Sequence, residues 1–111
     1  MAGLKGILRK RMTKLAKKKV ESGLKLSRVL NALGDPVRLE IVRQIHRDGE
    51  TPCSGFGMDM PKSTLSHHFR VLREAGVLGV RPEGTSILNF LLTDELEKSF
   101  PGLLAGVLRN L

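Results

Sequence analysis

The fold is decided by residues 62–78, which read KSTLSHHFRVLREAGVL. Leu65, Phe69 and Leu72 recur at the spacing of one helix face, so we expect a helix over residues 62–75 that buries this stripe. Gly76 is placed to end that helix. The opposite face carries hydroxyl, imidazole and guanidinium groups, and we expect it to stay exposed. Its residues are Ser63, Ser66, His67 and Arg70.

A β-hairpin is predicted directly after this helix. Residues 77–80 and 85–92 have the composition of two strands, and Arg81-Pro82-Glu83-Gly84 supplies typical turn residues between them. Alternation along the return strand predicts a shared face for Leu88, Phe90 and Leu92.

Two helices are predicted upstream. The first covers residues 24–33 and ends at Gly34. The second begins after Asp35, a suitable capping residue, with Pro36 in its first position, and ends near residues 48–49. The first helix is expected to bury Leu26, Val29, Leu30 and Leu33, and the second Val37, Ile41, Val42 and Ile45.

Residues 49–61 are rich in Gly and Pro and leave room for little more than one helical turn. We expect Phe56, Met58 and Met60 to enter the core from this segment. At the other end of the chain, Asp94 is predicted to cap a short helix that Pro101 interrupts. The apolar stripe that follows suits a contact with a second subunit, and its residues are Leu103, Leu104, Val107, Leu108 and Leu111.

Charge divides the 111 residues into two parts. Residues 1–20 hold eight Lys and Arg and no acid, whereas the other eleven basic residues equal the eleven acidic residues in number. We therefore expect a basic amphipathic arm over residues 1–22 and a neutral domain over residues 23–111. The arm has three open interpretations: a helix packed on the domain or a partner, a contact to the DNA backbone, or a helix on a membrane surface.

The order helix, helix, short turn, helix, hairpin, helix predicts a mainly α fold with a β-hairpin wing, a winged helix-turn-helix. The polar face of the 62–75 helix is typical of a helix that reads bases in the major groove, because small hydroxyls allow close approach. An ordinary solvent-exposed face is the alternative, and the hairpin with Arg81 near its tip favours DNA.

Two stretches carry a family resemblance. ALGDPVRLEIVRQI at 32–45 and KSTLSHHFRVLREAGVLGVRPEGTSILNFL at 62–91 together resemble the ArsR/SmtB repressors, over about residues 24–111. The resemblance implies a dimer formed through the first and last helices. It also implies DNA contacts from the positions of Lys62, Ser63, Thr64, Ser66, His67 and Arg70, to which we add Arg81.

The family's usual metal sites are not matched. Many members use a Cys-x-Cys pair before the reading helix, where this chain has TPCSGFGMDMP with Cys53 alone. A second family site uses Asp and His on the last helix, and residues 93–111 contain no His and no Cys. We therefore expect no metal and no cofactor, and Cys53 is the one candidate redox residue. Of the adjacent histidines, His67 should face DNA and His68 should pack beneath the helix, for example against a backbone carbonyl.

These patterns predict a cytoplasmic, homodimeric repressor that binds an imperfect palindrome in double-stranded DNA. No nucleophile, paired carboxylates or phosphate-binding loop indicates an enzyme, and no apolar run approaches the length that spans a membrane. Two alternatives remain at this point: an architectural protein that coats DNA through the basic arm, and a winged-helix module that binds another protein.

Overall fold

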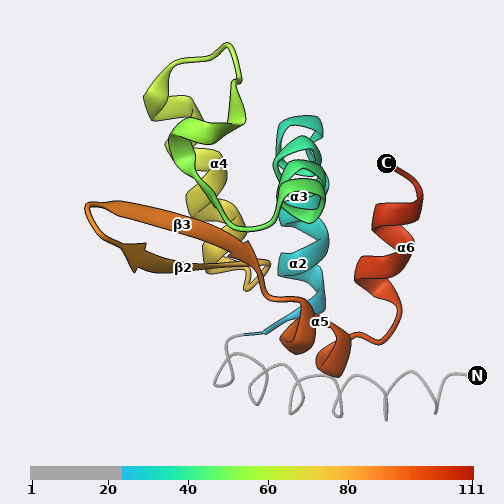
Figure 1. The fold of residues 1–111 in the computed structure, drawn as a ribbon. Helices are drawn as coiled ribbons and strands as arrows, with labels where there is room; N and C mark the ends of the chain where they lie inside the picture. Colours follow the sequence, from blue (N-terminus) through green and yellow to red (C-terminus); the bar gives the residue numbers. More distant parts are fainter. Residues whose placement is uncertain (1–23) are drawn as a thin grey trace, which may run out of the picture.

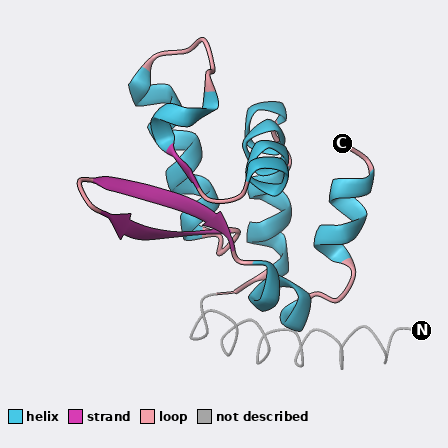
Figure 2. Ribbon diagram, in the orientation of Figure 1, coloured by secondary structure: helices cyan, strands magenta, loops and turns pink. Residues whose placement is uncertain are grey.

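The structure, a computed structural model, describes residues 24–111 (Figure 1). The basic arm predicted over residues 1–22 lies outside the described residues. The elements in chain order are α2 (Leu26–Leu33), α3 (Pro36–Asp48), β1 (Thr51–Pro52), the 3-10 helix η1 (Cys53–Phe56), α4 (Lys62–Glu74), β2 (Leu78–Glu83), β3 (Ser86–Leu91), α5 (Thr93–Ser99) and α6 (Leu103–Arg109). Helices dominate and one hairpin projects from them (Figure 2), which confirms the predicted fold class. Within residues 24–111, no helix is long and apolar enough to cross a membrane.

The corner between α2 and α3 forms as its sequence predicts. Asp35 Oδ1 accepts hydrogen bonds from the backbone N–H groups of Val37 at 2.8 Å and Arg38 at 3.1 Å, and Pro36 occupies the first helical position. These bonds satisfy amides that have no partner within the helix. The two helices therefore meet at a fixed turn.

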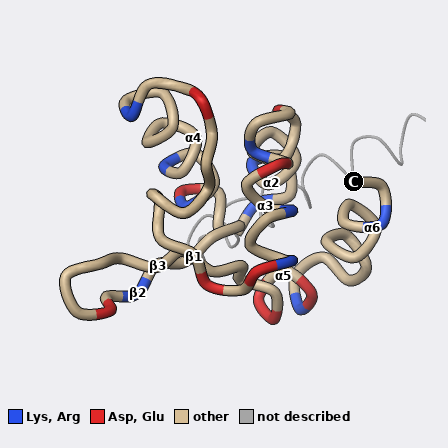
Figure 3. The backbone as a smooth tube through the Cα atoms, turned by 45° about the horizontal axis from the view of Figure 1, so that its top comes forward, with Lys and Arg blue, Asp and Glu red and all other residues tan. Residues whose placement is uncertain are grey.

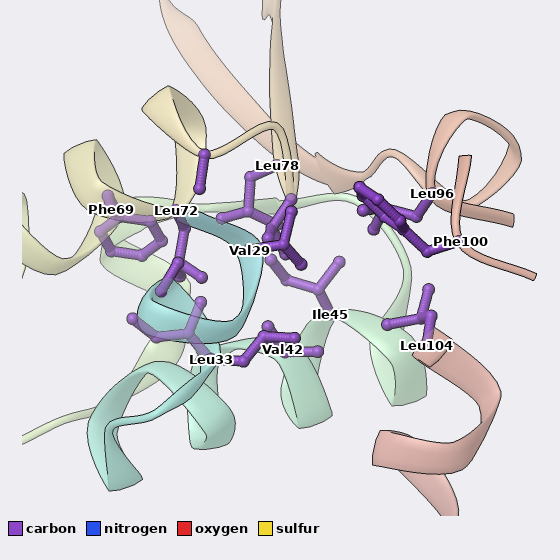
Figure 4. Packing of buried hydrophobic residues seen from close by; sticks show 14 of the residues in the cluster. Val29, Leu33, Val42, Ile45, Phe69, Leu72, Leu78, Leu96, Phe100 and Leu104 are labelled. Carbon is purple, nitrogen blue, oxygen red and sulfur yellow. The ribbon is translucent and has the colours of Figure 1, made fainter. Parts of the chain in front are cut away.

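The core lies where α2, α3 and α4 meet the base of the hairpin and the two C-terminal helices (Figure 4). Phe69 and Leu72 anchor α4 in it, while Leu65 is half-buried. Phe56 enters as predicted and meets the Phe69 ring edge-on, at a centroid distance of 5.0 Å. The other core side chains labelled in Figure 4 are Val29, Leu33, Val42, Ile45, Leu78, Leu96, Phe100 and Leu104.

Some predicted core positions are wrong. Leu26 and Leu30 are 42% and 49% exposed, because the buried stripe of α2 runs instead through Val29, Ala32 and Leu33. Val37 and Met58, also expected in the core, are half-buried and pack against it, whereas Met60 is only half-buried.

The hairpin is longer than its sequence suggests. Pairing continues through Arg81 and Pro82 to Glu83, and the turn lies at residues 84–85, where Gly84 has a φ of 59°. The prediction of a turn at residues 81–84 is therefore wrong. Pro82 is accommodated because β2 is an edge strand, which tolerates a residue without an N–H.

A third strand, β1, was not predicted. It pairs antiparallel with β3, giving the sheet order β1-β3-β2, and sets Thr51 opposite Asn89. Asn89 is completely buried, whereas Leu88, Phe90 and Leu92, which were expected to share one face of the strand, are half-buried. The extra strand thus covers the centre of β3.

The C-terminal part contains one further correction. Helix α5 begins at Thr93 after Leu92, so Asp94 lies inside its first turn and makes no capping hydrogen bond. Pro101 separates α5 from α6 as expected, and α6 runs beside the core through Leu104.

Candidate nucleic-acid interface

The outer face of α4 collects the predicted DNA-contacting residues of the helix. All of them are exposed, while Phe69 and Leu72 hold the opposite face in the core. The first turn contains no acidic residue, so the helix dipole and Lys62 together make this end electropositive. The exposed set is Lys62, Ser63, Thr64, Ser66, His67 and Arg70.

Two side chains of this face contact each other. Arg70 Nη2 lies 3.3 Å from His67 Nδ1, one turn apart along α4. The guanidinium can only donate, so His67 Nδ1 accepts and its Nε2 carries the proton in this arrangement. The pair leaves Nε2 and the remaining guanidinium N–H groups as donors on the exposed face.

His68 lies on the inner side of α4, half-buried as expected. Its partner is not a backbone carbonyl. His68 Nδ1 is 3.3 Å from Nη1 of Arg38 on α3 and 3.9 Å from Oδ1 of Asp35, the residue that caps α3. Sequence reasoning missed Arg38, although it follows the Asp35-Pro36 helix start by two residues.

Asp35 is the charged centre of this contact. Burial alone raises the pKa of its carboxyl, but the hydrogen bonds from the amides of Arg38 and Val37, with the charge of Arg38, outweigh burial and lower it below its ordinary value. Asp35 is therefore an anion that the α3 terminus and its neighbours stabilise.

Arg81 lies on the wing, within β2 rather than at a turn. Its Nε donates to Glu50 Oε2 at 2.8 Å and its Nη1 donates to Glu83 Oε2 at 2.6 Å. The hydrogen bonds with Glu50 and then Glu83 raise the pKa of Arg81, and the same contact lowers that of Glu50. A basic and an acidic position accordingly lie close together on the hairpin (Figure 3). Glu50 is 31 residues distant in sequence, and no local pattern signals it.

Cys53 is exposed at the start of η1. Its Sγ lies 3.3 Å from Asn89 Nδ2, which also donates to the Thr51 carbonyl at 3.3 Å. Cys53 borders a cavity of about 660 Å³ that Lys62, Ser66 and Ile87 also line. The cavity therefore lies between the η1 segment, the start of α4 and the tip of the hairpin.

Metal ligands do not gather in the described part of the chain. Between residues 24 and 111, no three His, Cys, Asp or Glu side chains are grouped so that they could hold an ion. His67 and His68, although adjacent in sequence, have ring centroids 5.9 Å apart and different neighbours.

Comparison with known proteins identifies the family to which this chain belongs. Residues 33–81 match a family described as a helix-turn-helix domain. An uncharacterized HTH-type transcriptional regulator of Methanocaldococcus jannaschii is 30% identical over 76 residues, which cover 67% of this chain and 85% of that protein.

Two solved structures are similar in fold. The transcriptional repressor BigR from Xylella fastidiosa superposes with a TM-score of 0.53 at 27% identity, over 83% of this chain and 95% of BigR. An ArsR family transcriptional regulator, RHA00566, gives a TM-score of 0.59 at 20% identity, over 77% and 84% of the two chains. Each of these relatives is described as a regulator or repressor of transcription. The chain therefore belongs to the helix-turn-helix transcriptional regulators and has the winged-helix fold of the ArsR type.

Proposed function

We propose that this regulator is a homodimeric repressor that reads a specific sequence in double-stranded DNA with the outer face of α4. The observation that carries the proposal is the division of this helix: Phe69 and Leu72 are buried while Ser63, Ser66 and Arg70 are exposed. Hydroxyl groups can bond several base edges and a guanidinium can bond guanine or a phosphate. BigR, a relative by fold, is itself described as a repressor.

A second copy of the chain is the proposed occupant of the apolar surface between α2 and α6. Leu30 and Leu111 are 49% and 44% exposed there, and Leu33, Leu103 and Val107 line the same hollow of about 590 Å³. A two-fold dimer through this surface would place two copies of α4 about 34 Å apart, in successive major grooves. The operator is then an imperfect palindrome, and its occupation would block a promoter.

The other parts of the chain have distinct proposed roles. The eight basic residues in residues 1–20 would attract any DNA, and the neutral remainder would supply sequence preference. Arg81 would add a wing contact, after it exchanges Glu50 or Glu83 for phosphate. The protein is proposed to act in the cytoplasm.

The signal that controls this repressor is proposed to be something other than the family's usual metals. The Cys-x-Cys pair and the C-terminal histidines of those sites are missing from the sequence. Cys53 is the proposed redox-responsive residue, because it is exposed and borders the same cavity as Lys62 and Ser66. Peroxide should then weaken operator binding by the wild type and leave Cys53→Ala unaffected; equal binding by treated and untreated wild type would exclude this role.

Selection of genomic fragments by the purified full-length protein tests the main proposal. Recovery of one palindromic motif, bound tightly as a dimer, is the expected result. Binding to all duplexes alike would instead favour the architectural role, and deletion of residues 1–20 would then abolish it. Recovery of no DNA would favour a winged-helix module that binds protein.

A further inference from the structure

Arg38 joins three helices at one point. Its Nε donates to the Ala32 carbonyl at 2.6 Å and its Nη2 donates to the Asn31 carbonyl at 3.2 Å, both at the end of α2. Its Nη1 lies 3.3 Å from His68 Nδ1 on α4. We call these contacts, together with Asp35, the Arg38 joint.

The contacts to α2 follow from the ends of helices. The last carbonyls of a helix have no amide partner within it and carry the negative end of its dipole. A guanidinium offers five N–H groups in a rigid plane, so Arg38 can donate to the Ala32 carbonyl and to the Asn31 carbonyl, which also accepts from the Gly34 N–H at 3.2 Å, and still donate elsewhere. The α2 end thereby fixes the plane of the guanidinium.

The contact to α4 is directional. Because Arg38 only donates, His68 Nδ1 must be the acceptor, with its proton on Nε2. Asp35, 3.9 Å from the same ring nitrogen, balances the charge of Arg38 and is itself held by the amides of residues 37 and 38. The ring is therefore fixed in position and in tautomer.

His68 lies between His67 and Arg70, two residues of the exposed face. Phe69 and Leu72 fix the depth of α4 in the core, but apolar contacts tolerate small rotations and shifts better than a hydrogen bond does. The hydrogen bond from Arg38 to His68 limits rotation of α4 about its own axis. A rotation would move Ser66 and Arg70 away from the base edges they are proposed to reach.

We propose that Arg38 and His68 are positioning residues that set the orientation of α4 for reading DNA, without touching DNA themselves. This inference rests on the proposed function, in which α4 is the reading helix. It assigns the Asp35-Pro36-Val37-Arg38 stretch a second role besides starting α3.

The test compares two substitutions of the same side chain. His68→Gln keeps an oxygen that can accept from Arg38, whereas His68→Leu keeps bulk and removes the acceptor. His46→Leu is the matched control, because His46 is an exposed histidine near the end of α3, outside the joint. Each variant of the full chain is first shown to be folded by its thermal transition. Its affinities for the selected operator and for an unrelated duplex are then measured at one salt concentration.

The expected readout is the ratio of operator to unrelated-duplex affinity. His68→Leu should lower this ratio about tenfold, the scale of one lost hydrogen bond to a charged group. His68→Gln should restore it to within about threefold of wild type, and His46→Leu should leave it unchanged. An unchanged ratio in His68→Leu, or an equal loss in His68→Gln, overturns the proposal.

Amide hydrogen exchange in the free protein separates this inference from the proposed function. His68→Leu should accelerate exchange at residues 66–70, and His68→Gln and His46→Leu should not. If the wild-type protein shows no sequence preference, the proposed function fails. In that case, unchanged exchange in His68→Leu would also overturn the inference that the Arg38 joint holds α4. Faster exchange with an unchanged affinity ratio would mean that the joint only stabilises the helix, which overturns the positioning role.

Discussion

Arg81 of the wing is bound by Glu50, the residue that precedes β1: Arg81 Nε lies 2.8 Å from Glu50 Oε2 and 3.0 Å from Oε1. Glu83 contacts the same guanidinium from the neighbouring part of β2. The positive charge that a wing commonly offers to DNA is thus already paired in the free protein. Both partners are substantially exposed, with 45% of the Arg81 side chain and 38% of the Glu50 side chain accessible. A phosphate group could therefore replace Glu50 as the partner of Arg81.

Glu50→Gln is expected to increase DNA affinity. The substitution removes the carboxylate that competes with phosphate for Arg81, so operator and unrelated duplexes should both bind more tightly. The dependence of log K on log salt should steepen by about one phosphate contact. Titrations at several salt concentrations measure both quantities. Glu95→Gln, an exposed carboxylate of α5, is the control for the change in net charge. Equal effects of the two substitutions would mean that Arg81 makes no DNA contact.

Lys62 and Arg70 should differ in what they contribute to binding. Lys62→Ala is expected to weaken operator and unrelated duplexes alike and to flatten the salt dependence by about one contact. Arg70→Ala is expected to cost about 1–3 kcal/mol for the operator and to relax the preference at one position. Competition binding with single-position operator variants measures this. Arg109→Ala on α6 should change neither quantity, and a loss of preference there would refute the assignment of α4.

The proposed dimer should depend on Leu30. Leu30→Glu places a charge on the half-exposed apolar surface between α2 and α6, so the protein should sediment as a monomer. The matched control is Ile87→Glu, since Ile87 is a more exposed apolar residue, at 58%, on the wing. A monomeric Ile87→Glu with a dimeric Leu30→Glu would move the interface to the hairpin.

Asp35 should make stability depend on pH at the acidic end. Its pKa in the folded protein is lowered from the ordinary 3.8, so its contribution is fully present above that value and is lost as pH falls through the folded pKa. Asp35→Ala should cost about 1 kcal/mol at neutral pH, the scale of a helix cap. Denaturant titrations at pH 7 and at pH 2 should show this difference shrinking. Asp94→Ala, which removes no capping bond, should have a smaller effect throughout.

The sequence predicted the helical part of the fold well because its signals are local. Asp35 and Pro36 start α3, Gly76 follows α4, and the spacing of Phe69 and Leu72 identifies the buried face of α4. Each of these features depends on neighbours within a few residues. The outward face of α4 followed directly, as the side opposite the apolar stripe.

The errors concern contacts between distant segments. Strand β1 has only two residues and exists because β3 offers it a partner, and that pairing buries Asn89. Arg38 and His68 are 30 residues apart in the sequence. Arg38 lies near the predicted start of one helix and His68 lies within another predicted helix, so no local pattern links the two residues. Leu30 resembled a core residue because an apolar side chain at helical spacing has the same pattern whether its own domain or a partner covers it.

Pro82 has a consequence for how this protein behaves at high concentration. An edge strand with free backbone N–H and carbonyl groups can template pairing with a strand of another molecule. In the described part of the chain β2 is such an edge, and Pro82 leaves a gap in its row of donors while Arg81 and Glu83 put charges on either side. The hairpin can therefore project from the core with its edge protected against edge-to-edge aggregation.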